Sequence, residues 1–169
     1  VELRPENGRK VARLGEMVKK AAQEQLSAEH PENSGFNGIT ISQLSAAPRR
    51  DGVDRQNAVI VSTGVLDWKD PDTWTGALDR SPCGTGTCAK MAVLHAKGAL
   101  PIGQDFQHEG ILGTVFTGRL INETRVGPHP AVVPTIRGTA WITGMADYVV
   151  DPTDPFQDGF TVGDIWGKT

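Results

Sequence analysis

The chain has 169 residues, of which 38% are hydrophobic and 22% charged, and its formal net charge is −3. This length and composition are typical of one globular domain that can bury a core. The charge balance gives no indication of a nucleic acid or an anionic membrane as partner. No run approaches the roughly 20 apolar residues that a membrane-spanning helix needs.

The sequence contains only two cysteines, Cys83 and Cys88. One such pair is too few for a disulfide framework or for a structural zinc site, so we expect no metal. The charged, polar N-terminus has no signal-peptide pattern, and a reducing cytoplasm is the expected compartment. Because the chain begins without Met, we expect a processed product or a fragment.

The first half of the chain predicts one helix and two strands. Apolar residues recur at helical spacing over residues 5–26, which predicts an amphipathic helix. A loop rich in turn residues follows at 30–38. Alternation predicts a strand at 39–46, and an apolar run predicts a buried strand at 57–66. Residues 67–82 form a polar loop.

The second half predicts a single helix among strands. The helix runs from about Thr87 to Ala99, with Gly98 placed for its C-terminal cap. It is apolar on most of its circumference, which is typical of a helix buried on all sides. Three β-like stretches follow at 109–127, 131–144 and 147–150, before a turn-rich tail. This order predicts an α+β fold with a mixed sheet wrapped around one buried helix.

The segment DRSPCGTGTCAKMAVLHAKG, residues 79–98, carries the strongest chemical signal. It places Cys83 at the start of the predicted buried helix, where free N–H groups and the helix dipole favour an anion. A thiol there is expected to have a lowered pKa and to act as an acid, base or nucleophile. Asp79 is a candidate for holding a substrate ammonium group. Alternatively, Cys83 is a small buried hydrophobe and the glycines only allow a tight turn.

Two nucleotide-binding patterns are partly present and are disfavoured. Gly84-x-Gly86-x-x-Ala89 matches the Rossmann fingerprint, and Asp105 follows about 20 residues later. However, the residues before Gly84 are not a hydrophobic strand, which that fingerprint requires. A P-loop would need Gly at position 89 and Ser or Thr at position 91, where the chain has Ala89 and Met91.

The remaining candidates near the motif carry weaker signals. No spacing supports a catalytic pair of Cys83 with His95, His108 or His129, so these histidines are interpreted as ordinary surface or core residues. Cys88, one turn into the helix, is interpreted as a packing residue.

Residues 79–98 closely resemble the second cysteine motif of the proline racemase family, which includes 4-hydroxyproline 2-epimerases and trans-3-hydroxyproline dehydratases. PENSGFNGITISQL, GTVFTGRL and DPTDPF also look like family segments, in family order. The resemblance implies the diaminopimelate epimerase fold, in which each of two similar domains rolls a mixed sheet around a central buried helix. Residues 1–169 would then be a single domain, the C-terminal half of a two-domain epimerase.

The resemblance also implies cofactor-independent inversion at Cα by a two-base thiol mechanism. Two cysteines flank the substrate, and Cys83 matches the second of them. Gly84 and Thr85 match positions whose backbone N–H groups bind the substrate carboxylate. Asp79 matches the aspartate that contacts the ring nitrogen. The expected substrate is 4-hydroxyproline or proline, and no cofactor is implied.

The chain departs from the family in lacking the first motif, a Cys or Ser followed by Gly-His. We therefore expect a missing N-terminal half or a partner chain, and no inversion by these residues alone. Two alternatives stay open: a trans-3-hydroxyproline dehydratase that pairs a Ser with Cys83, and a non-catalytic carboxylate-binding domain. A homodimer is compatible with either reading. Trp68 or Trp74 either shapes the substrate pocket or packs the 67–76 loop.

Overall fold

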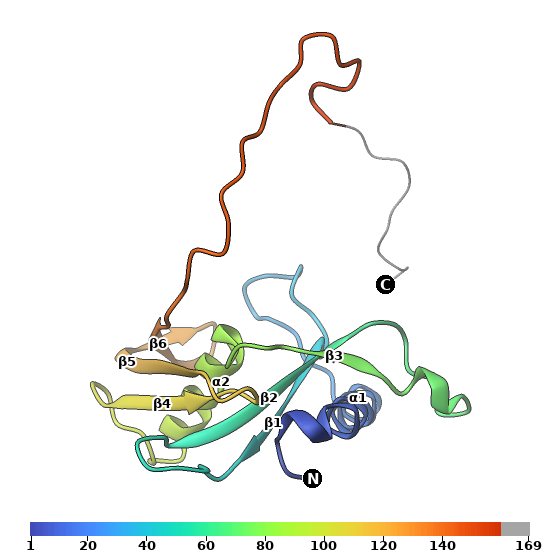
Figure 1. The fold of residues 1–169 in the computed structure, drawn as a ribbon. Coiled ribbons are helices and arrows are strands. Elements are labelled where there is room, and N and C mark those ends of the chain that lie inside the picture. Colours follow the sequence, from blue (N-terminus) through green and yellow to red (C-terminus); the bar gives the residue numbers. More distant parts are fainter. Residues whose placement is uncertain (160–169) are drawn as a thin grey trace. The chain divides into compact units, whose positions relative to one another are not determined.

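The computed structural model describes residues 1–159. It divides into a first unit, residues 1–138, and a second unit, residues 139–169, which are described separately. All helices and strands of the described chain lie in the first unit (Figure 1). In chain order they are η1 (Pro5–Asn7), α1 (Gly8–Gln25), β1 (Ile41–Ala46), β2 (Arg55–Ser62), η2 (Pro71–Thr73), β3 (Gly76–Leu78), α2 (Gly84–Ala96), β4 (Asp105–Glu109), β5 (Val115–Val126) and β6 (His129–Arg137).

The strands of the first unit form one mixed sheet. Its order is β1-β2-β4-β5-β6, and β3 pairs with β2 beside this path. Only β2 and β4 pair in parallel, while the other pairs are antiparallel. β3 and β4 pair with opposite ends of the same edge of β2, because β1 occupies its other edge along most of its length. The mixed α+β fold predicted from the sequence is confirmed.

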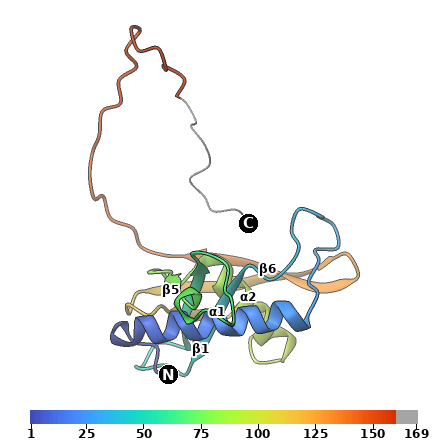
Figure 2. The same ribbon diagram turned by 90° about the vertical axis from the view of Figure 1, so that its right-hand side faces the viewer.

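Helix α1 packs against β1, β2 and β3, and Figure 2 shows its full length beside β1. Its apolar face supplies Val11 and Ala12 to a core that also contains Ile60 of β2. The contact is close, because a Cβ added at Gly15 would lie 2.5 Å from the Ile60 Cδ1 atom. The buried Glu16 carboxylate pairs with Lys19 at 3.1 Å. The predicted helix at residues 5–26 is thus confirmed.

Helix α2 packs against β5 and β6 around a second core of Met91, Leu100, Phe106 and Leu120. The strands cover only one side of the helix, since the Val93 side chain is 48% exposed. The prediction of a helix buried on all sides is therefore wrong for the described chain. Its sequence is apolar on nearly every side, but the single sheet of this chain can reach only one of them.

The boundaries of several elements differ from the sequence prediction. The strand expected at 57–66 is shifted to 55–62 and ends where Thr63 and Gly64 form a bend. The predicted stretch 109–127 holds the end of β4, a turn and β5. Helix α2 begins at Gly84 rather than Thr87 and ends at Ala96. Gly98 takes the left-handed conformation expected of a C-terminal cap, with φ of +70°.

The described part of the second unit, residues 139–159, forms turns but no helix or strand. The strand predicted at 147–150 and the last residues of the one predicted at 131–144 are therefore wrong for this chain. A strand needs a neighbouring strand for its backbone N–H and C=O groups, and this unit supplies none among its described residues. Its large apolar side chains are exposed, with Trp141 at 72% and Tyr148 at 94%. The rest of the predicted turn-rich tail lies outside the described residues.

Among the described residues, no helix is long and apolar enough to cross a membrane.

The close packing of α1 on β2 predicts the effect of a methyl group at Gly15. Gly15→Ala should lower the free energy of unfolding by roughly 1–2 kcal/mol, because the new Cβ overpacks the Ile60 contact. Alanine is the better helix former, so the loss would report the contact and not helix propensity. Gly64→Ala is the control, since nothing lies within 4 Å of a Cβ there. Equal stability of both variants in urea titrations would contradict this packing.

Candidate active site

The segment between β3 and α2 is hydrogen-bonded to β2, between the parts of that strand that pair with β3 and with β4. Asp79, directly after β3, donates its backbone N–H to the Val59 carbonyl oxygen at 2.9 Å. Cys83 is the N-cap residue of α2, with φ of +58° and ψ of 119°. It is the only described non-glycine residue with a positive φ. Such a conformation costs on the order of 1–3 kcal/mol and persists only where the surrounding structure enforces it.

The first turn of α2 surrounds the Cys83 sulfur with backbone donors. The Gly86 N–H donates to Cys83 Sγ at 3.3 Å. The N–H groups of Gly84 and Thr85 also belong to this first turn and have no acceptor within the helix. Gly86 has no room for a side chain, because the Gln43 side chain and Val59 lie directly against it. The start of α2 is therefore pressed onto β1 and β2, which fixes where its donors point.

Asp79 is tied to Cys83 through Ser81. The Ser81 hydroxyl and the Ser81 backbone N–H each donate to Asp79 Oδ1 at 2.9 Å. The Cys83 backbone N–H donates in turn to the Ser81 hydroxyl oxygen at 3.1 Å. These bonds bring the carboxylate and the thiol to the same end of the helix. All four residues named from the sequence, Asp79, Cys83, Gly84 and Thr85, thus lie at one turn.

The pKa of the Cys83 thiol is raised above its ordinary value. Burial is the largest cause, and the charge and hydrogen bond of Asp79 raise the pKa further. The Gly86 and Thr85 backbone N–H groups lower the pKa but do not outweigh burial and Asp79. The lowered pKa expected from the helix N-terminus is therefore wrong for this chain. At neutral pH Cys83 is a thiol.

Three buried polar side chains that the sequence analysis gave no role adjoin this turn. Asn57 of β2, Thr87 of α2 and His108 of β4 are each 0% exposed. His108 Nδ1 lies 2.9 Å from Thr87 Oγ1 and 3.0 Å from Asn57 Nδ2. The available signal was a polar residue inside an otherwise buried strand. A polar residue inside a buried strand does not by itself show that His108 faces Thr87 of α2.

The tryptophans of the 67–76 loop contact each other and α1. Their rings meet edge to face with centroids 5.9 Å apart. Trp68 Nε1 donates to Glu24 at 2.9 Å, and the Arg13 guanidinium lies 4.7 Å from the centre of the Trp74 ring. These contacts favour loop packing over a role in shaping the pocket. Cys88 is half-buried, and burial raises the pKa of its thiol.

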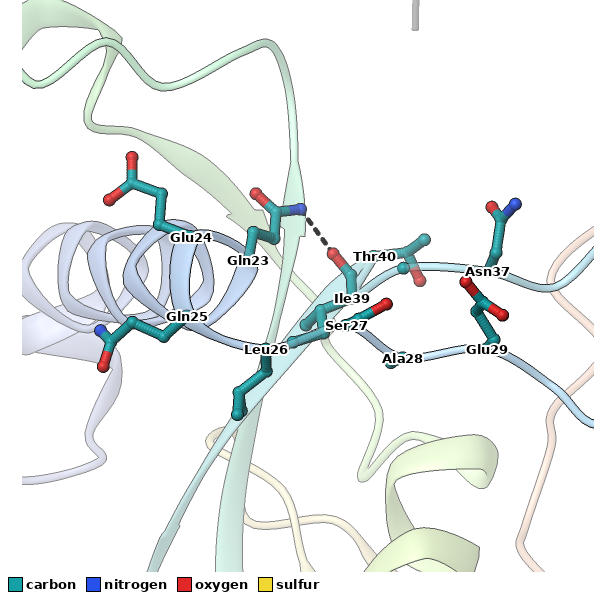
Figure 3. Close-up of a pocket in the computed structure, with 11 residues that line it drawn as sticks. Gln23, Glu24, Gln25, Leu26, Ser27, Ala28, Glu29, Asn37, Ile39 and Thr40 are labelled. Carbon is teal, nitrogen blue, oxygen red and sulfur yellow. Dashed lines mark hydrogen bonds between the residues drawn. The ribbon is translucent and has the colours of Figure 1, made fainter.

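Two hollows of the first unit lie apart from Cys83. One, of about 680 Å³, lies at the C-terminal end of α1, where Gln23 Nε2 donates to the Ile39 carbonyl oxygen at 2.6 Å (Figure 3). The other, of about 920 Å³, lies between the end of α2 and the tips of β5 and β6. Asp79 and Cys83 line neither of them. Within the described residues, no cluster of three or more His, Cys, Asp and Glu side chains could hold a metal ion.

The family model of proline racemase matches residues 1–161. The chain belongs to the proline racemase family. It is 45% identical over 146 residues to a 4-hydroxyproline 2-epimerase of Streptosporangium roseum, covering 86% of this chain and 40% of that protein. It is 36% identical over 160 residues to a proline racemase of Clostridioides difficile, covering 95% of this chain and 44% of that protein.

Solved structures of the family match the fold. A probable proline racemase of Agrobacterium radiobacter with bound carbonate gives a TM-score of 0.74 at 30% identity, covering 99% of this chain and 45% of that one. A hydroxyproline epimerase of Agrobacterium vitis with bound trans-4-hydroxy-L-proline gives a TM-score of 0.73 at 30% identity, covering 99% and 44%. This proline racemase family chain therefore spans less than half the length of the relatives it matches.

The contact between Asp79 and the thiol predicts how the pKa of Cys83 responds to a neutral side chain. Asp79→Asn should lower this pKa, because it removes the negative charge that opposes thiolate formation. The measurement is the pH dependence of iodoacetamide alkylation in a Cys88→Ser background, where Cys83 is the sole cysteine. Its midpoint should fall and alkylation at pH 7.5 should become faster. A midpoint that stays in place or rises would show that Asp79 does not face the thiol.

Proposed function

We propose that this chain is the C-terminal half of a two-domain, diaminopimelate epimerase-like enzyme that inverts Cα of an imino acid without a cofactor. Cys83 would supply one of its two acid/base thiols. The observation that carries this proposal is the Cys83 sulfur held at the Gly86 N–H, with Asp79 at the same turn. The names of the relatives, 4-hydroxyproline 2-epimerase and proline racemase, support the reaction class.

The turn offers complementary groups to an imino acid. The first-turn N–H groups of Gly84 and Thr85 would bind the substrate carboxylate, the Thr85 N–H turning from the Cys83 sulfur to do so, and the helix dipole would add to this attraction. The Asp79 carboxylate would hold the cationic ring nitrogen. A substrate bound by both groups would have its Cα between them, close to the Cys83 sulfur. This arrangement uses the opposite charges on the two sides of Cα that every α-amino or imino acid has.

Inversion then needs one proton removed and one delivered. A base on one face takes the Cα proton, and the electron pair of the C–H bond moves toward the carboxylate. The helix N-terminus would stabilise this negative charge as it develops in the transition state. Such stabilisation is usually the largest single contribution to catalysis. An acid on the opposite face gives a proton to Cα. Cys83 is the acid in one direction and, as thiolate, the base in the other.

The raised pKa of Cys83 suits this exchange. In the free chain it is a thiol, which is the form that delivers a proton. A cationic ring nitrogen on Asp79 would offset the negative charge that raises the thiol pKa. Substrate binding would therefore bring the two protonation states of Cys83 closer in free energy. An acid/base group works best when its pKa lies near the working pH.

The second acid/base group is proposed to lie in the part of the relatives that this chain does not contain. The chain covers only 40–44% of the curated relatives it matches. The described residues 139–159 expose Ile142, Met145 and Val149 at 85%, 94% and 87%. Apolar side chains at this density are expected to pack against further protein.

We expect the cytoplasm as the compartment, consistent with two free thiols.

The substrate proposed first is 4-hydroxyproline, because the relative named 4-hydroxyproline 2-epimerase is 45% identical to this chain. Proline is the second candidate, from relatives that are 36% and 38% identical.

The test is Cα hydrogen exchange of trans-4-hydroxy-L-proline in heavy water, followed by NMR with the complete gene product. We expect deuterium at Cα together with the cis-D epimer. Cys83→Ser should slow both by about 100-fold or more, because one acid/base group is lost. Cys88→Ser is the matched control and should keep the activity. If none of trans-4-hydroxy-L-proline, L-proline and trans-3-hydroxy-L-proline exchanges at Cα, the carboxylate-binding alternative takes the place of this proposal.

A second prediction concerns the 169-residue chain alone. It should show no inversion above the rate without protein, because only one face of Cα would have an acid/base group. Polarimetry over hours at high protein concentration would detect slow turnover. Sustained epimer formation by the isolated chain would contradict the two-half mechanism.

A further inference from the structure

The buried cluster of Asn57, Thr87 and His108 has no role in the mechanism proposed above. All three side chains are 0% exposed. Burying polar groups opposes folding unless they are well hydrogen-bonded. The cluster adjoins the turn that holds Cys83, which indicates a role beyond packing.

Thr87 holds both peptide units that flank the Cα atom of Cys83. Its backbone N–H donates to the Cys83 carbonyl oxygen at 3.0 Å. Its hydroxyl donates to the carbonyl oxygen of the preceding residue, Pro82, at 3.1 Å. The orientation of these two peptide units defines the φ and ψ of Cys83. Thr87 therefore enforces the φ of +58° and, with it, the direction in which the thiol leaves the backbone.

His108 holds Thr87 in turn, with Nδ1 2.9 Å from Thr87 Oγ1. Burial lowers the pKa of His108 to about 4, so the imidazole is neutral at neutral pH and has one N–H. Since Thr87 uses its hydrogen on Pro82, its lone pairs can accept from His108. The buried Asn57 Oδ1 has no partner in the described part of the chain. Turning that amide would let Oδ1 accept from the same Nδ1–H.

The end of β4 also supports the turn directly. A Cβ added at Gly110, two residues after His108, would lie 3.0 Å from the Pro82 nitrogen. The intervening Glu109 is buried and pairs with Arg50 at 3.0 Å. The strand end is thus anchored on one side and lies against the Ser81–Pro82 backbone on the other. His108 is held on a rigid element.

We propose that His108 is a positioning residue for Cys83 and acts through the Thr87 hydroxyl. His108 Nδ1–H donates to Thr87 Oγ1, and Thr87 Oγ1–H donates to the Pro82 carbonyl oxygen. It keeps the Cys83 backbone in its strained conformation and the sulfur at the N–H groups of Gly86 and Thr85. The hydrogen-bond partners of His108 among the described residues are Thr87 and Asn57, not the thiol. The inference rests on the proposed function only in taking Cys83 as the acid/base group.

The test compares paired variants in the complete gene product with Cys88→Ser. Thr87→Val and His108→Leu remove the hydrogen bonds, while Thr87→Ser and His108→Asn keep a group that can form them. The readout is the pH midpoint of Cys83 alkylation by iodoacetamide, followed by mass spectrometry of the peptide that contains Cys83. Thr87→Val and His108→Leu should raise the midpoint by about half a pH unit or more, because the thiolate loses its N–H donors. The conservative variants should show less than half of that shift.

Two controls separate positioning from general destabilisation. Leu120→Ala opens the second core without touching the cluster and should leave the midpoint unchanged. His95→Gln removes a histidine from the other end of α2 and should also leave it unchanged. Unfolding by urea identifies any variant that does not fold. An unchanged midpoint in folded Thr87→Val and His108→Leu, or an equal shift in Leu120→Ala, would overturn the inference.

The alkylation midpoint is measured without substrate. The positioning role of His108 can therefore be disproved independently of the proposed function. If the parent protein shows no Cα exchange but the midpoint shifts as expected, only the proposed function is lost. If the parent protein exchanges Cα, kcat of His108→Leu should fall about tenfold or more, with a smaller change in KM. An unchanged kcat together with an unchanged midpoint would sink the positioning role and leave the epimerase proposal standing.

Discussion

The site depends on one constraint: the start of α2 packs tightly against the Gln43 side chain of β1 and the Val59 side chain of β2. The strands β3 and β4 pair with the two ends of one edge of β2, so that residues 57–59 pair with no strand on that edge. Val59 uses its carbonyl to bind Asp79 and its side chain to exclude a Cβ at Gly86. The helix therefore cannot shift, and the first-turn donors keep their direction. Cys83, with its positive φ, is the N-cap residue of the helix that these contacts hold.

The electrostatics of the turn are a balance between two opposing influences. The helix N-terminus favours the thiolate, while burial and Asp79 favour the thiol, and the second pair wins in the free chain. A reversible acid/base group benefits from such a balance, because a bound cation at Asp79 can shift it. An isolated reactive thiolate would instead be exposed to alkylation and oxidation. The carboxylate that is proposed to bind the substrate is thus also one of the groups that raise the pKa of the Cys83 thiol.

The local pattern of this sequence predicts most elements and brings the site residues together. Residues 79–85 are contiguous, so the sequence alone places Asp79, Cys83 and Gly84 near the start of one helix, while the contact between Asp79 and the thiol depends on the Ser81 hydrogen bonds. The pKa of Cys83 was not predictable in the same way, because it depends on burial and on the contact with Asp79. Nor was the role of His108, whose contact with Thr87 spans 21 residues of sequence and arises only when β4 lies beside β2.

The errors at the C-terminus have a different physical origin. Residues 139–150 have the β-branched and aromatic composition of a strand, and the sequence prediction followed that composition. Composition does not supply a neighbouring strand, and the second unit contains none among its described residues. Likewise α2 is apolar on nearly all sides, yet the strands of this chain cover one of them. The chain spans less than half the length of these relatives.

The central claim is that the Cys83 thiol faces the bound substrate. The most direct measurement is protection from alkylation, in which Cys83 and Cys88 are each followed by mass spectrometry in the complete gene product with increasing trans-4-hydroxy-L-proline. We predict saturable protection of Cys83, while Cys88 reacts at an unchanged rate and serves as the internal reference. Alkylation of Cys83 at the same rate with saturating ligand would contradict the account, because no substrate could then lie over its sulfur.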